Sequence, residues 1–262
     1  MGSLRAKQGS YIEILKAIQL GQLQGLTRPD RLLASQIWNT LNKMEYDPDL
    51  KLYLPFDEAS GATAHDLSGN GNTGTAEGAT ITDGVFGKCR SFDGDNDYVS
   101  VPNGIISLKT FPWTISMWIN PALADDAYFF SAYQNNYSYN RGGLYITSDG
   151  ILYAGINYGA SGGTSFGVNG VTAVSLNSWH FCALSVENSL ASFYVDGVLR
   201  DTNTAFAVGT EVIEVFTLGA NLDQPITHFT GFIDEPRFYL RTLSADEMYL
   251  HYLAGALKLG LI

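Results

Sequence analysis

From residue 49 onward the chain alternates apolar and polar residues with a period of two, the pattern of strands that lie between a core and solvent. Glycine, asparagine and aspartate separate the alternating runs, notably at Asp149-Gly150 and Asp196-Gly197, and these residues favour hairpin turns. Many short strands at such spacing predict an all-β fold of two antiparallel sheets packed as a sandwich. The runs are 50–56, 98–101, 114–119, 144–146, 152–156, 179–186, 191–195, 213–219 and 229–239.

Residues 1–48 have a different pattern, which predicts a short helical arm in front of a β domain at 49–262. Apolar residues at 11, 14, 15 and 18 follow helical spacing, and Gly21 and Gly25 would end that helix. A second helix is expected from Pro29 onward. Two short helices cannot bury their apolar faces alone. We therefore expect the arm to serve either as a cap on the β domain or as an anchoring or oligomerisation element.

One further helix is expected near the end of the chain. Residues 244–253 are amphipathic, and Ser244 followed three positions later by Glu247 has the form of a capping box. Such a helix would close the β domain.

The charge is unevenly distributed. Residues 49–262 contain 9 Lys or Arg against 22 Asp or Glu, within a chain of net charge −11. Because nucleic-acid phosphates would be repelled by this acidic domain, a nucleic-acid partner is not expected. No run approaches the roughly 18 apolar residues of a membrane span. The first 26 residues also lack the continuous apolar core of a signal peptide.

The two cysteines, Cys89 and Cys182, lie in apolar runs that are typical of strands. Buried free thiols are common in such positions. A disulfide between them is the alternative that the sequence leaves open.

Several segments occur in an order that resembles one family. They are Leu54–Glu58, Asp66–Gly74, Gly87–Val99, 114–121, 179–186, 193–197 and Gly231–Tyr239. Together they resemble the laminin-G-like, concanavalin-A-like jelly rolls of lectins, adhesins and carbohydrate-associated proteins. The resemblance covers about residues 50–254 and leaves out the arm. It implies a two-sheet jelly roll that acts as a binding module.

The resemblance also implies a structural calcium site. Its ligands would be Asp234 in the last long strand, with Asp57 and Asn70 from the first loops. Calcium takes about six to eight oxygen ligands, many of them backbone carbonyls, which a Gly/Asn-rich loop can present. The alternative is that Asp234 caps a turn or pairs with Arg237, while Asp66 makes an Asx turn. Because proline cannot donate to a strand ladder, strand pairing is expected to be interrupted at Pro236.

Residues 127–141 are expected to form a loop that is rich in aromatic and amide side chains. Aromatic rings stack on sugars, and amides and arginine hydrogen-bond to hydroxyl groups, so this loop is the preferred surface for a glycan or protein ligand. Tyr153 and Asn157 are expected nearby. The alternative is ordinary strand packing, with every second aromatic residue buried. The candidate ligand-binding residues are Tyr133, Asn135, Asn136, Tyr137, Tyr139, Arg141 and Tyr158.

The sequence does not favour an enzyme. A glycosidase needs two carboxylates across one cleft, and the Glu-x-Asp-x-x-Glu strand motif of jelly-roll glucanases does not occur. Glu211 and Glu214 are three positions apart and would lie on opposite faces of a strand. The four histidines are scattered outside any nucleophile-elbow or zinc-binding motif.

These observations predict a non-enzymatic structural or adhesive module. The main hypothesis is a virion protein, in capsid decoration or in the tail, or an extracellular surface assembly protein. It would contact glycans or proteins through the β domain and form a homo-oligomer or larger assembly through the arm. This hypothesis joins an extracellular-type domain to a chain start that has no visible signal peptide. The alternative is a carbohydrate-binding lectin module, and a glycoside hydrolase ranks third.

Overall fold

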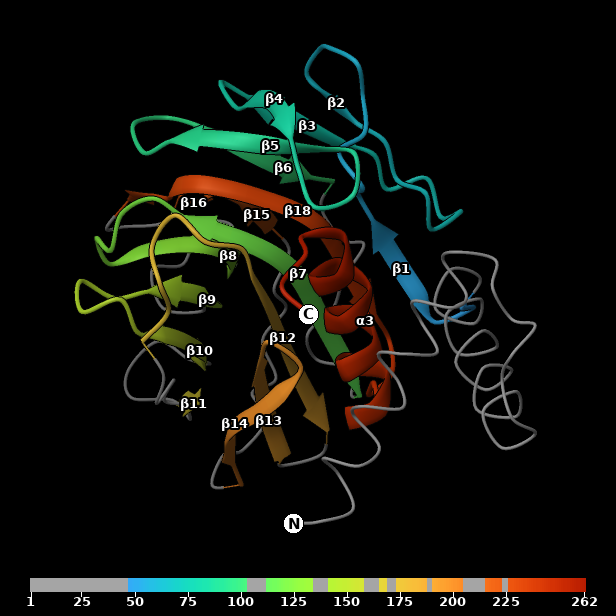
Figure 1. Ribbon diagram of the computed structural model, residues 1–262, viewed down its shortest axis with the longest axis vertical. Coiled ribbons are helices and arrows are strands. Elements are labelled where there is room, and N and C mark those ends of the chain that lie inside the picture. The colour runs from blue at the N-terminus through green and yellow to red at the C-terminus, as the bar shows by residue number, and fades with distance from the viewer. Residues whose placement is uncertain are drawn as a thin grey trace.

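The computed structural model describes residues 47–102, 112–133, 141–157, 165–168, 173–187, 190–204, 215–222 and 226–262. These residues form two facing antiparallel sheets with a helix on the outside of one of them (Figure 1). The predicted all-β sandwich is therefore confirmed. The predicted arm, residues 1–48, lies outside the described residues except for Asp47 and Pro48. No helix among the described residues has the length and apolarity of a membrane span.

The first sheet, sheet A, has the strand order β14-β13-β12-β7-β18-β5-β4, and β1 also pairs with β18. On one edge of the long strand β18, the first half pairs with β5 and the second half pairs with β1. The register of β18 shifts between Asp234 and Arg237, which confirms the interruption expected at Pro236. The strands are β1 (Leu50–Tyr53), β4 (Thr80–Asp83), β5 (Lys88–Asp93), β7 (Trp113–Pro121), β12 (His180–Glu187), β13 (Leu190–Val195), β14 (Val198–Asn203) and β18 (Thr230–Tyr239).

The second sheet, sheet B, has the order β11-β10-β9-β8-β15-β6-β3-β2. A small pair, β16 (Ala220–Asn221) and β17 (Thr227–His228), accompanies it. The strands of sheet B are β2 (Thr63–Ala64), β3 (Gly74–Glu77), β6 (Tyr98–Val101), β8 (Ala127–Tyr133), β9 (Arg141–Ile146), β10 (Leu152–Asn157), β11 (Ser165–Val168) and β15 (Val215–Leu218).

Strand β8 corrects the sequence-based prediction of a loop over residues 127–141. Residues 127–133 are a strand, and Arg141 begins the next one. The reason is a register shift between Tyr128 and Phe130. It places two consecutive residues, Phe129 and Phe130, in the core. Such a bulge breaks the period of two on which the prediction depended.

The core lies between the two sheets and is built from alternate residues of their strands. Ile115, Met117 and Ile119 of β7 face Phe130 and Leu144 of sheet B within one buried apolar cluster. Removing these side chains from water is the main stabilisation available to such a sandwich. Cys182 lies in this cluster, and both Cys182 and Cys89 are buried free thiols, so the disulfide alternative does not hold.

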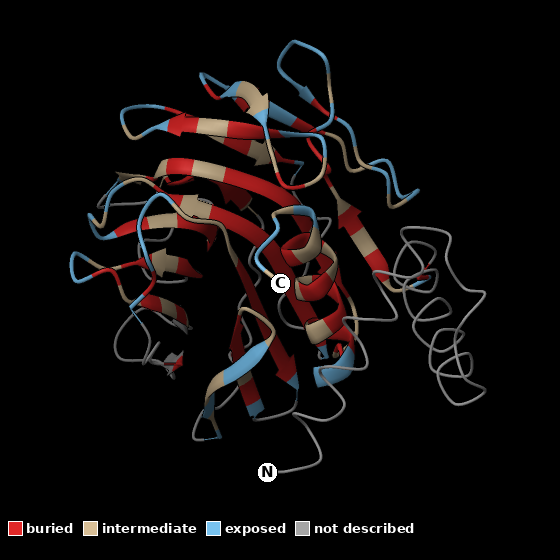
Figure 2. Cartoon of the chain, viewed as in Figure 1, coloured by how far each residue is buried: buried red, intermediate tan, exposed pale blue. Residues whose placement is uncertain are grey.

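A second apolar layer covers the outer face of sheet A, where helix α3 (Ala245–Lys258) packs. The predicted capping box is confirmed at Ser244, although the helix extends past Leu253 to Lys258. Trp118 of β7 lies between Phe181 of β12 and Tyr252 of α3, at ring-centroid distances of 5.6 and 6.0 Å. Figure 2 shows buried residues running along β7, β18 and α3.

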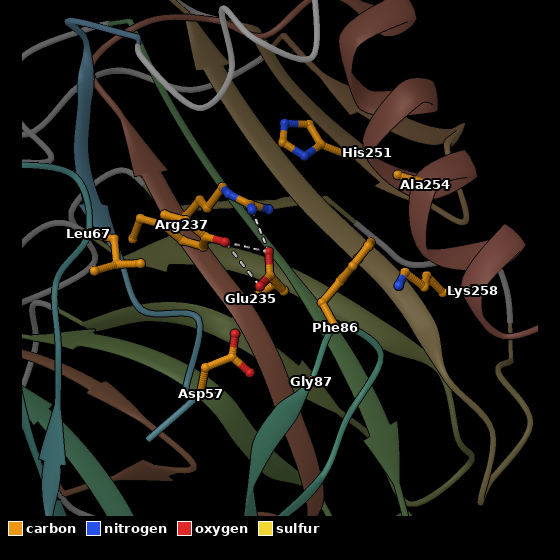
Figure 3. A pocket seen from close by; sticks show the side chains of 10 residues that line it. Asp57, Leu67, Phe86, Gly87, Glu235, Arg237, His251, Ala254 and Lys258 are labelled. Carbon is orange, nitrogen blue, oxygen red and sulfur yellow. Dashed lines mark hydrogen bonds and ion pairs between the residues drawn. The ribbon is translucent and has the colours of Figure 1, made fainter. Parts of the chain in front are cut away.

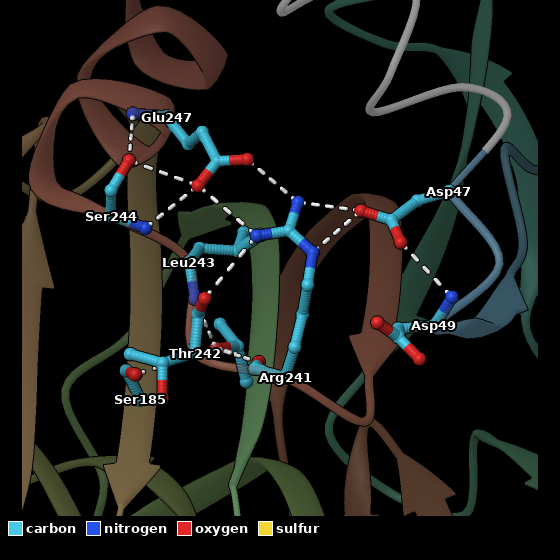
Figure 4. Close-up of polar contacts among 9 residues, drawn as sticks. Asp47, Asp49, Ser185, Arg241, Thr242, Leu243, Ser244 and Glu247 are labelled. Atoms are coloured by element: carbon cyan, nitrogen blue, oxygen red, sulfur yellow. Dashed lines mark hydrogen bonds and ion pairs between the residues drawn. The ribbon is translucent and has the colours of Figure 1, made fainter.

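An arginine connects the start of the β domain to the start of α3 (Figure 4). Arg241 Nε donates to Asp47 Oδ2 at 2.6 Å, and Arg241 Nη2 donates to Glu247 Oε1 at 2.6 Å. Glu247 is the residue that completes the capping box. Arg241 and Asp47 are both largely buried. Their pairing therefore holds the segment before β1 close to the start of α3.

Candidate functional site

The outer face of sheet B carries a row of three tyrosines, one from each of three neighbouring strands. Tyr128 of β8 lies opposite Tyr145 of β9, which lies opposite Tyr153 of β10. The ring centroids are 5.0 and 5.3 Å apart. Their neighbours along the chain face the core, so the strand alternation turns these rings outward. Each tyrosine is half-buried, and the row is called the tyrosine ladder below.

The ladder combines aromatic surface with neutral hydroxyl groups. Burial raises the pKa of Tyr145 to about 12, with smaller contributions from Tyr128, Tyr153 and Asp126. The central phenol is therefore protonated at any physiological pH. It can donate one hydrogen bond and accept others, which matches the hydroxyl groups of a sugar.

Three glycines on neighbouring strands adjoin the ladder. Gly143 of β9 lies opposite Gly155 of β10, which lies opposite Gly167 of β11. A Cβ atom on Gly143 would lie 2.2 Å from the carbonyl oxygen of Phe130 and 2.6 Å from the ring of Tyr128, so this position has to be glycine for β8 and the ring to lie where they do.

Strand β16 bounds this face on the side of β8. Ser131 of β8 is fully buried, and its Oγ donates to Asn221 Oδ1 at 3.2 Å. Thr217 of β15, which pairs with Ser131, donates to the carbonyl oxygen of Ala220 at 2.6 Å. Residues 220–221 therefore cover Ser131 and Thr217, and the ladder lies on the part of the sheet beyond them.

Asp234 lies at the bulge of β18, near the edge where β5 and β1 meet. Its Oδ2 accepts hydrogen bonds from the backbone N–H groups of Val85 and Phe86 at 2.8 and 3.0 Å. Its Oδ1 is buried without a hydrogen-bond partner in the structure. Burial raises the pKa of Asp234 to about 8, and the negative charges of Glu235 and Asp57 act in the same direction.

The other two predicted calcium ligands lie apart from each other. Asp57 Oδ1 accepts from the backbone N–H of Lys88 at 2.7 Å, in the same region as Asp234. Asn70 Nδ2 instead donates to the carbonyl oxygen of Leu50 at 2.9 Å, and Leu50 pairs with Tyr239 at the far end of β18.

No group of three or more His, Cys, Asp or Glu within the described ranges is arranged to hold a metal ion. Asp57, Asn70 and Asp234 do not form one donor set, so calcium stays a prediction. Asp66 makes the Asx turn of the alternative interpretation, since its Oδ1 accepts from the N–H of Ser68 at 2.9 Å. Arg237 pairs with Glu235 and not with Asp234.

A cavity of about 420 Å³ lies next to this region, between β1, β18 and α3 (Figure 3). Glu235 lines it with a backbone φ of 58°, in the left-handed region. The Tyr53 hydroxyl donates to Glu235 Oε2 at 3.0 Å, and the guanidinium of Arg237, which also bonds to Glu235, lies 4.1 Å from the centre of the Tyr53 ring. These groups satisfy one another and hold the bulge in place.

Comparison with known families decides what kind of domain this is. A family model described as the concanavalin A-like lectin/glucanases superfamily matches residues 93–248. The chain belongs to this superfamily. The matched segment begins in β5 and ends in α3, so it contains most strands of both sheets, including the tyrosine ladder. No curated protein matches the chain in sequence.

Solved structures of the superfamily's fold are similar over most of the chain. Domain 4 of AbnA, an extracellular arabinanase from Geobacillus stearothermophilus in complex with arabinotriose, has a TM-score of 0.62 and 22% identity, covering 79% of this chain and 98% of that one. The binding domain of botulinum neurotoxin DC, in complex with SialylT, has a TM-score of 0.62 and 15% identity, covering 79% of this chain and 52% of that one.

Trypanosoma rangeli sialidase has a TM-score of 0.62 and 14% identity, covering 87% of this chain and 39% of that one. The chain thus spans about half of the toxin domain and about two fifths of the sialidase. At these identities the similarity shows the fold alone.

The residues predicted for ligand binding in this concanavalin A-like domain are only partly described. Tyr133 is half-buried at the end of β8 and pairs with Arg141, which pairs with Asn157. This cross-strand row runs parallel to the ladder on the far side of Gly143. The predicted residues Asn135, Asn136, Tyr137, Tyr139 and Tyr158 lie outside the described residues.

The list of candidate ligand-binding residues left out Tyr128 and Tyr145, although Tyr128 belongs to the segment 127–141 that was expected to form the ligand surface. Both alternate with buried neighbours, so their outward orientation could have been inferred from the sequence. Their assembly into one row with Tyr153 depends on strand register, which the sequence did not specify across β8, β9 and β10.

Proposed function

We propose that this domain is a carbohydrate-binding module without a catalytic role, and that it binds a glycan on the outer face of sheet B. The tyrosine ladder is the observation that carries the proposal. Half-buried aromatic rings with neutral hydroxyl groups suit sugars, which offer both apolar ring faces and hydroxyl groups. The arabinanase domain that shares the fold over nearly its whole length is in complex with arabinotriose, which supports a sugar as the ligand.

The ladder is favoured over the cavity beside α3 because the polar side chains of the cavity already bond to one another. In the cavity, Glu235, Arg237 and Tyr53 bond to one another, and a ligand would have to break these bonds. At the ladder the rings are half-buried, so a ligand can cover them without dismantling an ion pair.

Hydrolysis is not part of the proposal. Glycoside cleavage uses two carboxyl groups on either side of the scissile bond. The two carboxylates nearest the ladder, Asp126 and Asp149, come from adjacent segments on the same side of it, so they do not lie on either side of a ligand. The strands of sheet B contain one acidic residue, Glu77 of β3. It is separated from β8 by β6 and β15.

The test is affinity electrophoresis of the full chain in gels that contain a series of linear polysaccharides, with arabinan among them. We expect retardation by at least one polysaccharide, and Tyr145→Ala and Tyr153→Ala to weaken it by about tenfold or more, equivalent to about 1.4 kcal/mol. The matched control is Tyr98→Ala, a half-buried tyrosine of β6 on the same sheet. Equal losses in Tyr98→Ala and Tyr145→Ala would rule out the ladder as the binding surface.

The virion or surface-assembly hypothesis remains as a second candidate. It rests on the apolar stripes of residues 1–48, which two short helices cannot bury alone, and the comparisons give it no support. Light scattering on the full chain tests it, because a defined oligomer is expected for an assembly protein and a monomer for an isolated binding module.

A further inference from the structure

The charged residues of the sandwich are segregated between its two sheets. The strands of sheet B contain a single basic residue, Arg141, and a single acidic residue, Glu77. The other basic residues within the described ranges belong to sheet A or to the segment 241–258 that continues into α3. They are Lys51, Lys88, Arg90, Arg200, Arg237, Arg241 and Lys258.

Two exposed carboxylates lie along one side of the tyrosine ladder, where β8 begins and where β9 turns into β10. Asp126 directly precedes β8, and Asp149 lies in the turn between β9 and β10. Asp126 Oδ1 accepts a hydrogen bond from the backbone N–H of Ser148 at 3.0 Å, so the two acidic residues come from adjacent segments. The negative charge of Asp126 also acts on Tyr145, which places it within electrostatic reach of the ladder.

This arrangement disfavours a negatively charged ligand at the ladder. An anionic sugar there would meet Asp126 and Asp149, with a whole chain of net charge −11 behind them. Like charges in close apposition weaken binding and slow association. An uncharged glycan is not repelled by these charges, and it can still make the aromatic contacts and the hydroxyl hydrogen bonds.

We propose that the ladder selects linear, uncharged polysaccharides that lie across β8, β9 and β10, and that Asp126 and Asp149 reject carboxylated glycans such as polyuronates. This inference rests on the proposed function, because it concerns the same surface. It adds the chemical class of the ligand and assigns a selectivity role to two residues that contact no sugar in the proposal.

The experiment uses one polysaccharide in two charge states. The neutral polymer that most retards the full chain is carboxymethylated with chloroacetate at part of its hydroxyl groups, which releases chloride and adds carboxylates without changing the linkages. We expect the carboxylated polymer to bind about tenfold more weakly at low salt. The difference should shrink at about 0.5 M NaCl, where charges are screened over a few ångströms.

The double variant Asp126→Asn/Asp149→Asn identifies the source of the selectivity. Asparagine suits position 126, where the backbone φ of 58° is one that asparagine and aspartate tolerate best. The ratio of the two dissociation constants should fall several-fold in this variant. In the matched control Glu77→Gln, on the same sheet but away from the ladder, the ratio should stay within about twofold of the parent's.

The outcomes separate this inference from the function on which it rests. Equal or tighter binding of the carboxylated polymer, or an unchanged ratio in the double variant, overturns the selectivity and leaves the carbohydrate-binding function standing. If no neutral polysaccharide retards the chain, the proposed function fails, and the selectivity fails with it.

Discussion

The two outer faces of the sandwich carry aromatic residues in different environments. On sheet A, Trp118 and Phe181 are each 1% exposed, because α3 covers them. On sheet B, Tyr128, Tyr145 and Tyr153 remain half-buried, and no helix of the described chain packs on them. The same alternation of inward and outward residues builds both faces.

The side chains themselves account for this difference. Burying a tryptophan or phenylalanine under a helix removes a large apolar area from water, so the face that carries them is stable when covered. A tyrosine has an apolar ring and a polar tip and is suited to a surface that is only sometimes covered. The face of sheet A therefore contributes to stability, whereas the described tyrosines of sheet B stay half-exposed, as the proposed glycan-binding surface requires.

The largest expected effect is that one substitution on each face changes a different property, stability on sheet A and glycan binding on sheet B. Trp118→Ala removes a fully buried ring from the contact between β7 and α3, which should lower the free energy of unfolding by about 3–5 kcal/mol. Tyr145→Ala should cost only about 1 kcal/mol, since it loses cross-strand contacts that stay half-exposed. Urea unfolding monitored by tryptophan fluorescence and circular dichroism measures both.

Glycan binding should respond in the opposite order. Per folded molecule, Trp118→Ala should bind like the parent, whereas Tyr145→Ala should lose affinity. A loss of binding in folded Trp118→Ala would mean that the two faces are coupled and would contradict the division of roles.

The second prediction concerns pH and again separates the faces. The pKa of Asp234 is about 8 in the folded chain, against a usual value of 3.8. Between these values the folded state holds a proton that the unfolded state releases. The free energy of unfolding should therefore fall as the pH rises from about 4 to about 8, and level off above that. Binding at the ladder should not follow this profile, because its central tyrosine stays neutral throughout.

Asp234→Asn is the control, because an amide cannot titrate. In this variant the part of the pH dependence of the unfolding free energy that comes from Asp234 should disappear. Calcium would reverse the sign, since a bound cation keeps the carboxylate charged. If stability rises with pH in calcium and this rise disappears with a chelator, the predicted calcium site exists and Asp234 is one of its ligands.

A smaller effect is expected where α3 approaches sheet A most closely. Gly255 passes Trp118 so tightly that a Cβ atom would lie 2.2 Å from the indole ring. Gly255→Ala should therefore destabilise the chain by about 1–3 kcal/mol through overpacking, although alanine is the better helix former.

The neighbouring substitution Ala254→Gly is the matched control for Gly255→Ala. It lowers helix propensity and removes only one half-buried methyl group, so it should cost about 1 kcal/mol. Stabilisation by Gly255→Ala would show that α3 can move away from the sheet, and that this face is less tightly covered than the structure indicates.

Most of the fold could be predicted from the sequence where the local signal agreed with the tertiary structure. The alternation at 114–119 and the capping box at Ser244 both gave elements that the structure confirms. The interruption at Pro236 was predictable because it follows from the missing N–H group of proline. Strand β8 was missed because its bulge puts Phe129 and Phe130 on the same side.

The candidate site was less predictable because it consists of residues that meet only through strand pairing. Tyr128 and Tyr153 are 25 positions apart and become neighbours through β9. Periodicity indicates which face a residue occupies, but not which strand lies beside it. The predicted aromatic region therefore overlaps the ladder at Tyr128 and includes Tyr153 as an expected neighbour, whereas Tyr145 was not expected there.

The smallest expected effect concerns the two thiols, one on the inner and one on the outer surface of sheet A. Cys182 lies in the core between the sheets, whereas Cys89 lies beneath the turn that joins β4 to β5, with its Sγ donating to the carbonyl oxygen of Asp83 at 3.3 Å. Burial raises the pKa of Cys89 to about 12 and that of Cys182 well above its usual value. Reducing agents should leave the melting temperature unchanged, since neither residue is in a disulfide.

Thiol labelling should then distinguish the two positions by rate. Opening the short turn over Cys89 needs only local unfolding, but exposing Cys182 requires the sheets to separate. Cys89 should therefore react faster under native conditions, and Cys182 only at the rate of global unfolding. The single variants Cys89→Ser and Cys182→Ser assign the two phases by mass spectrometry. Equal rates for the two thiols would mean that the β4–β5 turn opens only when the whole sandwich does.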